Sequence, residues 1–375
     1  MPRRPSLAAA HPIRIALVSA LLAGCAASPP VPPVPPSSPA TSALPASTWW
    51  RADDERTRTP ACRATLDAVR DDLRHSPTTS LMAVHGRDVV FSYGPIDRPS
   101  VIASARKSLL AMLYGQPVAQ GTIRLDDTLA DLGIDDIGGL LPIERQARVR
   151  DLLAARSGVY HPAANPGDSG ADAPPRGSQQ PGTYFLYNNW DFNAAGDVYE
   201  QLTHRDIYQA FAQDIATPLG LEDFHVEREH RSGDATRSSH LAYHFHLSAR
   251  DMARIGELML AHGEWNGRQL VPADWTTTIT TPVTRAADMH PAHDARRKID
   301  YGYLWWIPEA PGDSPLAGSY FAWGYFGQFI LVAPKRDMVI VHKFDTRAAV
   351  GDEVEHLGPN QFLALARRII DAPCR

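Results

Sequence analysis

The sequence predicts an α+β fold, in which an antiparallel sheet is flanked by terminal helices and joined to a helical lobe. Three observations support this class: hairpin-like strands come early, helical patterns fill the middle, and further strands and a helix come last. Strands and helices that are segregated in this way, without β-α-β alternation, are typical of α+β proteins. The first and last strands are therefore expected to share one sheet, with the terminal helices on one of its faces.

The early and late segments supply the expected sheet and its cover. Period-two apolar patterns with turn residues between them indicate strands, and apolar positions three and four apart indicate helices. In chain order, these elements are a helix over residues 60–75, strands over 80–85 and 89–93, strands over 329–333 and 338–343, and a helix over 360–370.

The middle of the chain carries the expected lobe. Ser248 is a plausible N-cap for an amphipathic helix over residues 248–261, with Asp251 in its first turn. The stretch 161–183 is rich in Pro, Gly, Ser and Ala and is long for a plain connection, so we interpret it as a lid or a border of a site. Further helices are predicted over residues 105–113, 148–155 and 206–217.

The N-terminal segment has the pattern of an export signal. Three arginines precede an apolar run over residues 15–22, which is too short to span a bilayer but suits a signal peptide. The run ends in Leu22-Ala23-Gly24-Cys25, which resembles the lipobox of bacterial lipoproteins. The resemblance implies that residues 1–24 are removed, that Cys25 is lipidated, and that Ala26 directs the protein to the outer membrane, facing the periplasm. An ordinary signal peptide with a chance cysteine is the alternative.

Residues 25–48 are rich in proline, serine and alanine, and cannot pack a core. Such segments favour the extended polyproline II form, so we interpret this one as a tether for a domain over residues 49–375. Membrane attachment is expected through the lipid anchor only.

Two cysteines remain in the expected domain. Cys62 lies on the apolar face of the first helix, and Cys374 follows the last one. The oxidising periplasm permits a disulfide, which would tie the chain ends together if the terminal helices pack side by side. Two unpaired structural thiols are the other interpretation.

The composition excludes several partners. Hydrophobic residues make up 44% of the chain and the formal net charge is -5, which is ordinary for a globular protein and gives no basic surface for nucleic acid. Gly-rich phosphate loops are absent. No metal or cofactor is expected, because no recognised metal-ligand spacing occurs among the clustered histidines His225, His230, His244, His246, His290 and His293.

Ser104-Ala105-Arg106-Lys107 is an S-x-x-K motif at the start of a predicted helix. Residues three apart share a helix face, so Lys107 can approach the Ser104 hydroxyl. A serine needs a nearby base to become nucleophilic, and a lysine serves as that base when its pKa is lowered. A capping serine followed by a solvated lysine is the bland alternative.

Tyr187-Asn188-Asn189 is a second candidate element. A tyrosine phenol near a lysine ammonium can act as a proton shuttle, and an asparagine can orient both partners and a substrate amide. On its own, such a cluster also fits an ordinary turn.

Several stretches in the same order resemble class C β-lactamases and their relatives, the D,D-peptidases, family VIII esterases and aminohexanoate-oligomer hydrolases. Besides the two motifs above, they include Asp151-Leu152-Leu153 with Ser157-Gly158-Val159, residues 248–254, Tyr301-Gly302-Tyr303-Leu304-Trp305-Trp306, and Gly327-Gln328 before a strand. The resemblance covers most of residues 80–343 and implies the β-lactamase/transpeptidase-like fold.

The resemblance also implies roles for individual residues. Ser104 would form an acyl-enzyme, and Lys107 and Tyr187 would move protons. Asn189 would position substrate, and the backbone N–H groups of Ser104 and Tyr325 would form the oxyanion hole.

One departure from the family pattern concerns the third motif, which is Lys-Thr-Gly or His-x-Gly in the relatives. The matching segment here is Ala322-Trp323-Gly324, which lacks the cationic side chain that helps hold a substrate carboxylate. Trp323 lines the acyl pocket or belongs to the core; both interpretations are open.

These expectations describe a cofactor-free serine hydrolase that acts through an acyl-enzyme on an ester or amide. A D,D-peptidase or weak β-lactamase acting on cell-wall-like substrates is one alternative. A catalytically silent ligand-binding lipoprotein with the same fold is the other.

Overall fold

The computed structural model describes residues 50–374, except 53–57, 166, 168–170 and 349–355. All the described residues fall within one of the two units into which the chain divides, residues 39–375. The predicted signal peptide, Cys25 and the tether over residues 25–48 lie outside the described residues. Within the described part, no helix is both long and apolar enough to cross a membrane.

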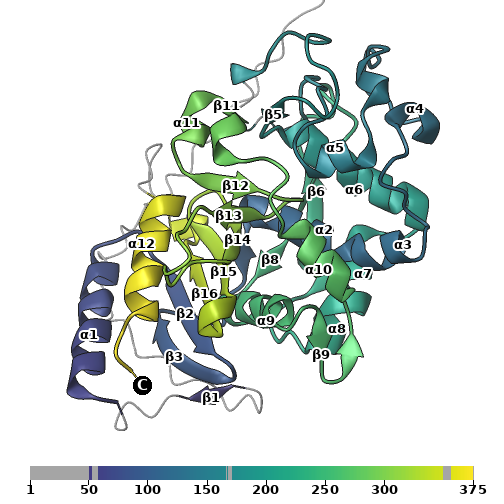
Figure 1. Ribbon diagram of the computed structural model, residues 1–375. Helices are drawn as coiled ribbons and strands as arrows, with labels where there is room; N and C mark the ends of the chain where they lie inside the picture. Colours follow the sequence, from purple (N-terminus) through teal and green to yellow (C-terminus); the bar gives the residue numbers. More distant parts are fainter. Residues whose placement is uncertain (1–49, 53–57, 166, 168–170, 349–355, 375) are drawn as a thin grey trace, which may run out of the picture. The chain divides into compact units, whose positions relative to one another are not determined.

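An eight-stranded sheet forms the centre of the fold (Figure 1). All neighbouring strands pair antiparallel except β1 and β3, which are parallel. In spatial order, the strands are β1 (Arg51–Ala52), β3 (Asp88–Tyr93), β2 (Ser80–His85), β16 (Met338–Lys343), β15 (Gln328–Ala333), β14 (Tyr320–Gly324), β13 (Trp306–Pro308) and β12 (Ile299–Tyr301).

The first and last predicted strands meet in the middle of this sheet. In the β2–β16 pair, Met82 lies opposite Val341 and Ala83 lies opposite Ile340. The predicted antiparallel sheet is therefore confirmed. Because its central strands come from the early and late parts of the chain, both parts are required to form it. Strands β15 and β16 are buried along their whole length, because helices cover both of their faces.

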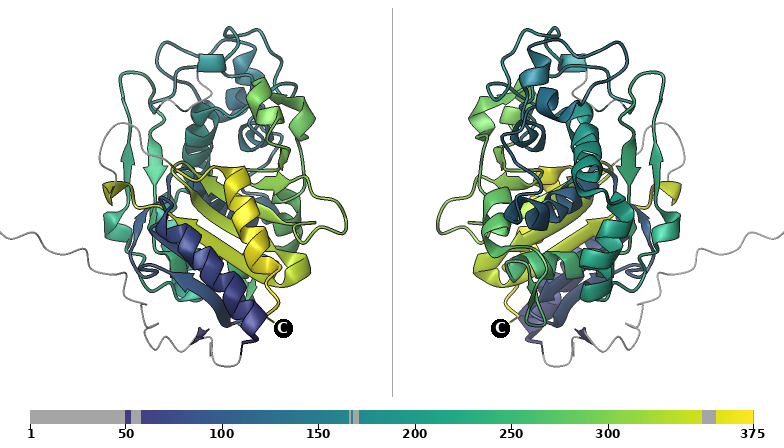
Figure 2. Two further views of the ribbon diagram at one scale, coloured as in Figure 1. Left: turned by 90° about the vertical axis from the view of Figure 1, so that its left-hand side faces the viewer. Right: turned by 90° about the vertical axis from the view of Figure 1, so that its right-hand side faces the viewer.

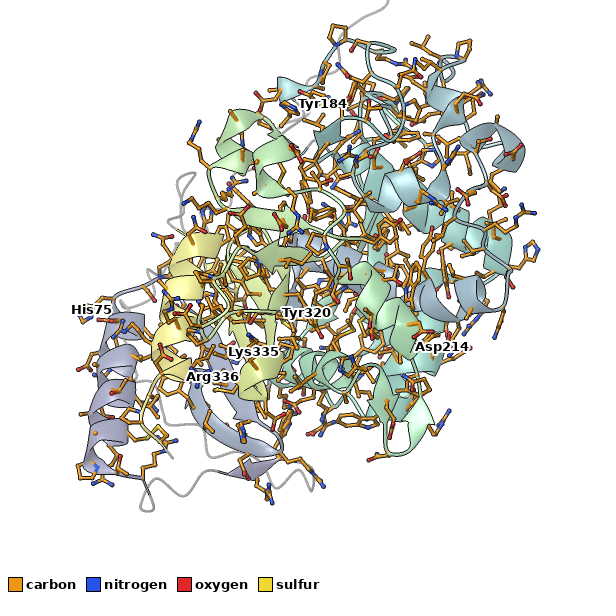
Figure 3. The ribbon with its side chains drawn as sticks, in the orientation of Figure 1. His75, Tyr184, Asp214, Tyr320, Lys335 and Arg336 are labelled. Carbon is orange, nitrogen blue, oxygen red and sulfur yellow. A yellow bond between two sulfur atoms is a disulfide. The ribbon has the colours of Figure 1, made fainter. Side chains whose placement is uncertain are left out.

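Helices α1 (Pro60–Arg74) and α12 (Pro359–Ile370) lie side by side over one face of the sheet (Figure 2). The ring of Phe362 from α12 stacks on Phe329 of β15, with centroids 4.2 Å apart. Helix α9 (Ala249–Leu260) packs on β15 and β16, and Ser248 caps it by accepting a hydrogen bond from the Asp251 N–H. Tyr320 of β14 also links the sheet to α9, because its hydroxyl donates a hydrogen bond to the Met259 carbonyl (Figure 3).

The remaining elements connect or border these layers. They are α2 (Arg106–Leu113), α3 (Gly115–Ala119), α4 (Leu129–Leu132), α5 (Val149–Leu153), α6 (Asn189–Thr203), α7 (Ile207–Phe211), α8 (Thr217–Leu219), α10 (Ala273–Ile279) and α11 (Ala292–Ala295). Short strand pairs join β4 (Ser100–Val101) to β8 (His246–Leu247), β5 (Phe185–Leu186) to β11 (Met289–His290), β6 (His230–Ser232) to β7 (Ala242–His244), and β9 (Glu264–Trp265) to β10 (Arg268–Gln269).

The helix expected over residues 206–217 is present. It consists of α7, a π-helical stretch over residues 212–216 and α8, which follow one another without a break. Helix α6, one of the two longest described helices, was not expected. All residues from Trp190 to Gly196 are buried, so this part of its sequence does not alternate between an apolar and a polar face.

Cys62 and Cys374 form a disulfide between α1 and the end of α12, across a sequence separation of 312 residues. The Thr59 hydroxyl donates to the Pro373 carbonyl beside it, at 3.0 Å. The two chain ends of the domain are thus joined covalently.

We expect the double variant Cys62→Ser, Cys374→Ser to lower the free energy of unfolding by about 2–5 kcal/mol, because a cross-link over so long a loop restricts the unfolded chain. Urea unfolding of oxidised wild type, reduced wild type and the variant measures this loss. Equal stability of all three would contradict it.

Glu257 is a buried carboxyl of α9, with an Oε1 atom that has no hydrogen-bond partner among the described residues. Burial, with a smaller contribution from Asp337, raises the pKa of Glu257 from its ordinary 4.5 to about 8. Between these values the folded protein holds a proton that the unfolded chain releases, so stability falls as pH rises through this window.

Glu257→Gln removes this loss, and we expect the variant to be more stable than wild type by on the order of 2–4 kcal/mol above pH 8, with no gain below pH 4. Thermal unfolding across the pH range checks the prediction, with Glu264→Gln at an exposed site as the matched control. A gain that does not depend on pH would contradict it.

Candidate active site

Ser104 lies in a short 3-10 helix, Ala103–Ala105, that leads directly into α2. The α-helix begins at Arg106, one residue later than expected, and Lys107 lies in its first turn. Ala103 has a φ of 46°, a value that L-residues rarely adopt. Such local strain is often found where a turn presents a functional side chain.

Lys107 is the centre of the hydrogen-bond network, as its side chain is buried and its Nζ contacts three oxygens. It donates to the Ser104 Oγ at 3.0 Å, the Tyr187 Oη at 2.8 Å and the Asn189 Oδ1 at 2.8 Å. An ammonium has three protons, so these acceptors match its full donor capacity. Phe192 adds an aromatic face 4.2 Å from the Nζ atom. The structure therefore brings together the four side chains that the two sequence motifs single out.

The start of α6 positions Tyr187 and Asn189. Asn188 caps this helix by accepting from the Trp190 N–H, and its amide donates to the Val159 carbonyl. Asn189 donates to the Asn165 carbonyl, which orients its amide so that the Oδ1 atom meets Lys107.

Asp191, in the first turn of α6, holds the helix against the Ser157-Gly158-Val159 stretch. The Ser157 hydroxyl donates to the Asp191 Oδ1 at 2.6 Å, and burial raises the pKa of Asp191 well above its ordinary value. The Ser157-Gly158-Val159 motif, which resembles the β-lactamase relatives, thus has a structural role: it holds the helix that carries Asn189.

The end of β14 lies directly against the Ser104 segment. A Cβ atom at Gly324 would be 2.1 Å from the Ile102 carbonyl oxygen and 3.0 Å from the Ala105 nitrogen. Only glycine permits this approach, which places Tyr325 beside the segment that carries Ser104. Tyr325 is half-exposed and lines the same cavity as Ser104.

A cavity of about 430 Å³ opens above Ser104. Among its lining residues are Ser104, Tyr187, Asn189, Trp306, Trp323 and Tyr325. The ring centroids of Tyr187 and Trp306 are 5.2 Å apart, and those of Trp306 and Trp323 are also 5.2 Å apart. Trp323 fits both interpretations: it borders the cavity and also stacks on buried Phe329, 6.4 Å away.

Five lining residues with charged or titratable side chains were not expected at the site: Arg106, His244, His293, Asp294 and Arg297. Burial, reinforced by Arg106, lowers the pKa of His244 to about 4, so this imidazole is neutral at pH 7. Arg106 is buried and donates to the Asn193 Oδ1 at 3.0 Å. Nothing in the local sequence distinguishes Arg297 from its neighbour Arg296, so only the tertiary structure reveals it.

The border of the site includes part of the stretch 161–183. Asn165 and Gly167 line the cavity, in agreement with the interpretation of this stretch as a site border. Tyr184, which follows the stretch, stacks on His290 of β11 with centroids 4.2 Å apart (Figure 3). No group of three or more His, Cys, Asp or Glu side chains among the described residues could hold a metal ion.

Comparison with known proteins gives a family match and a set of related structures. A family model described as Beta-lactamase matches residues 66–354. An uncharacterised protein of Alkalihalophilus pseudofirmus is 29% identical over 110 residues, which is 27% of this chain and 30% of that protein. Monacolin J acid methylbutanoyltransferase of Aspergillus terreus is 29% identical over 167 residues, 36% of this chain and 40% of that protein. The chain thus spans less than half the length of these curated relatives.

Solved structures extend the likeness to the whole fold. A penicillin-binding protein homologue from Caulobacter crescentus has a TM-score of 0.58 at 16% identity, over 84% of this chain and 97% of the other. Simvastatin synthase from Aspergillus terreus also has a TM-score of 0.58, at 17% identity, over 83% of this chain and 98% of the other. At these identities, the structures show a shared β-lactamase/transpeptidase-like fold.

Proposed function

The chain belongs to the beta-lactamase family. On this premise we propose that it is a serine hydrolase, which cleaves ester or amide bonds through an acyl-enzyme on Ser104. One observation carries the proposal: the Lys107 Nζ lies 3.0 Å from the Ser104 Oγ and 2.8 Å from the Tyr187 Oη. A nucleophile within hydrogen-bond reach of a base, with that base held by further groups, is the arrangement that covalent catalysis requires.

In the proposed reaction, one group of the Lys107–Tyr187 pair is unprotonated before attack, either the Lys107 amine or the Tyr187 phenolate. The Ser104 Oγ attacks the substrate carbonyl carbon and gives its proton to that group. The bond between the carbonyl carbon and the leaving oxygen or nitrogen then breaks, and the same pair returns a proton to the leaving alcohol or amine. Water repeats the sequence on the ester of Ser104 and releases the acid. Asn189 keeps Lys107 in place throughout, since its Oδ1 accepts from the Nζ.

The tetrahedral intermediate carries a negative oxygen that needs hydrogen-bond donors. We assign this role to the backbone N–H groups of Ser104 and Tyr325, which the close contact at Gly324 places on adjoining segments. Donors aligned on the developing charge in a water-poor site contribute several kcal/mol to catalysis.

Stopped-flow hydrolysis of p-nitrophenyl esters tests the proposal. An acyl-enzyme predicts a burst of p-nitrophenol equal to the enzyme concentration, with an intact mass raised by one acyl group during turnover. Absence of turnover as well as of both signals from folded protein, across esters, amides and β-lactams, would instead support the silent binding protein.

We also propose that Cys25 carries a lipid anchor that holds the domain at the outer membrane, because the lipobox-like sequence and the Pro-rich tether precede the domain. Detergent fractionation of cells checks this proposal: Cys25→Ala should move the protein from the membrane fraction to the soluble periplasm. Unchanged membrane association would overturn it.

A further inference from the structure

We propose that His342 is a positioning residue for the oxyanion hole, because it holds the loop between β14 and β15 that carries the Tyr325 N–H. This inference rests on the proposed function and adds to it a residue that lies outside the cavity lining. The loop consists of residues 325–327, which connect the paired residues Gly324 and Gln328.

The backbone of this loop has a conformation that depends on its contacts. Phe326 has a φ of 63° and Gly327 a φ of 84°, so two successive residues lie in the left-handed region. A phenylalanine rarely adopts this region, and such a conformation persists where the surrounding structure enforces it. The close approach of Gly324 to Ile102 fixes the start of the loop. The end of the loop is held by a different residue.

His342 of β16 holds the end of the loop. Its imidazole is fully buried, with the Nδ1 atom 2.6 Å from the Gly327 carbonyl oxygen and the Nε2 atom 2.8 Å from the Thr78 Oγ1. A Cβ atom at Gly327 would be 3.3 Å from the His342 Cε1, so the ring packs directly against the loop backbone. The imidazole therefore connects the loop to the segment between α1 and β2.

The two contacts fix the direction of both hydrogen bonds. Burial lowers the pKa of His342 to about 4, so the ring is neutral at pH 7 and has a single N–H. The Gly327 carbonyl can only accept, which assigns this N–H to the Nδ1 atom. The Nε2 atom then accepts from the Thr78 hydroxyl. The imidazole thus acts as a donor to the loop whose tautomer is set by Thr78.

The described residues offer this loop no second support of the same kind. The hydrogen bond from His342 is the one that a described side chain makes to the backbone of residues 325–327. Gln328 donates to the Phe344 carbonyl at 2.6 Å, but this bond holds the strand after the loop. Loss of the imidazole N–H should therefore loosen the loop and displace the Tyr325 N–H from the oxyanion.

Three variants separate the two ends of the imidazole ring. His342→Asn places an amide N–H near the Nδ1 position and can keep the donation to Gly327. His342→Gln places its amide near the Nε2 position and keeps only the contact with Thr78, while His342→Leu keeps neither. Removal of an oxyanion donor costs about 10²–10³ in kcat, and a displaced donor costs part of that. We expect the Gln and Leu variants to lose about ten- to a hundredfold in kcat for p-nitrophenyl acetate with little change in KM, and Asn to stay within about threefold of wild type.

The thiono analogue of this ester shows whether the oxyanion hole is the part affected. Its developing charge lies on sulfur, which accepts hydrogen bonds weakly, so it gains little from the hole. The oxygen-to-sulfur ratio of kcat/KM should fall about tenfold in His342→Gln and His342→Leu but not in His342→Asn. Val341→Ala is the control for lost packing, since it truncates the neighbouring buried residue of β16 and should leave the ratio unchanged. Equal losses on both esters, or an Asn variant as impaired as Leu, would assign His342 a structural role only and overturn the inference.

Hydrogen exchange separates this inference from the proposed function. In the Ser104→Ala background, mass spectrometry should show faster amide exchange over residues 325–329 when His342→Gln or His342→Leu is added, and unchanged exchange with His342→Asn. If wild type hydrolyses neither ester, the hydrolase proposal fails, and this measurement still decides whether His342 holds the loop. Equal exchange in all four proteins would overturn it.

Discussion

Replacement of Ser104 by alanine is expected to lower kcat for p-nitrophenyl esters by a factor on the order of 10⁴ or more, because the attacking atom is removed. The rest of the site stays in place: Lys107 keeps its hydrogen bonds to Tyr187 and Asn189. We therefore expect KM to change little. Steady-state kinetics, with far-ultraviolet circular dichroism to verify folding, measure the effect.

Ser108→Ala is the matched control for this variant. Ser108 lies four residues after Ser104, in α2. Its hydroxyl donates a hydrogen bond to the Leu304 carbonyl at 2.6 Å and does not contact Lys107. This variant should keep its activity while losing about 1 kcal/mol of stability. Activity of Ser104→Ala above a few per cent of wild type would place the nucleophile elsewhere.

Replacement of Lys107 by methionine is expected to lower kcat by about 10³-fold, the usual contribution of a positioned proton carrier. Methionine keeps much of the length and apolar contact of the lysine stem against Phe192 but carries no proton. It also leaves the Tyr187 hydroxyl and the Asn189 Oδ1 without their donor. The remaining Ser104 is then an ordinary alcohol, and both acylation and deacylation slow down.

Lys335→Met serves as the control, since it removes an exposed lysine whose Nζ donates to the Gly312 carbonyl. Its kinetics should match those of wild type. A Lys107→Met variant within tenfold of wild-type kcat would show that another group moves the proton.

The contact between Ser104 and Lys107, the proposed nucleophile and base, could be predicted from the sequence because their relation is local. A serine and a lysine three residues apart at the start of a helix lie on the same helix face, independently of the tertiary structure. The terminal helices were likewise predicted from the spacing of their apolar residues. Cys62 was correctly assigned to the buried face of α1. Strands β2 and β16 were predicted because buried strands have largely apolar runs. Strand β3 is only partly buried, and the turn that precedes it helped to identify it.

The rest of the site depends on tertiary contacts that no local pattern encodes. Arg297 and Trp306 enter the cavity only because β12, β13 and β14 pair across the sheet. These strands are short or carry Gly and Pro nearby, so their periodicity is weak. The departure at the third motif could be recognised in the sequence, because Ala322-Trp323-Gly324 lacks a cationic side chain.

The measurement that tests the central claim most directly is intact-mass labelling of the domain with a fluorophosphonate probe, comparing wild type with Ser104→Ala. We expect a single adduct on wild type and none on the variant, because only an activated serine attacks the phosphorus. A folded wild-type protein that takes no label, or a variant that takes as much as wild type, would contradict the assignment of Ser104 as the nucleophile.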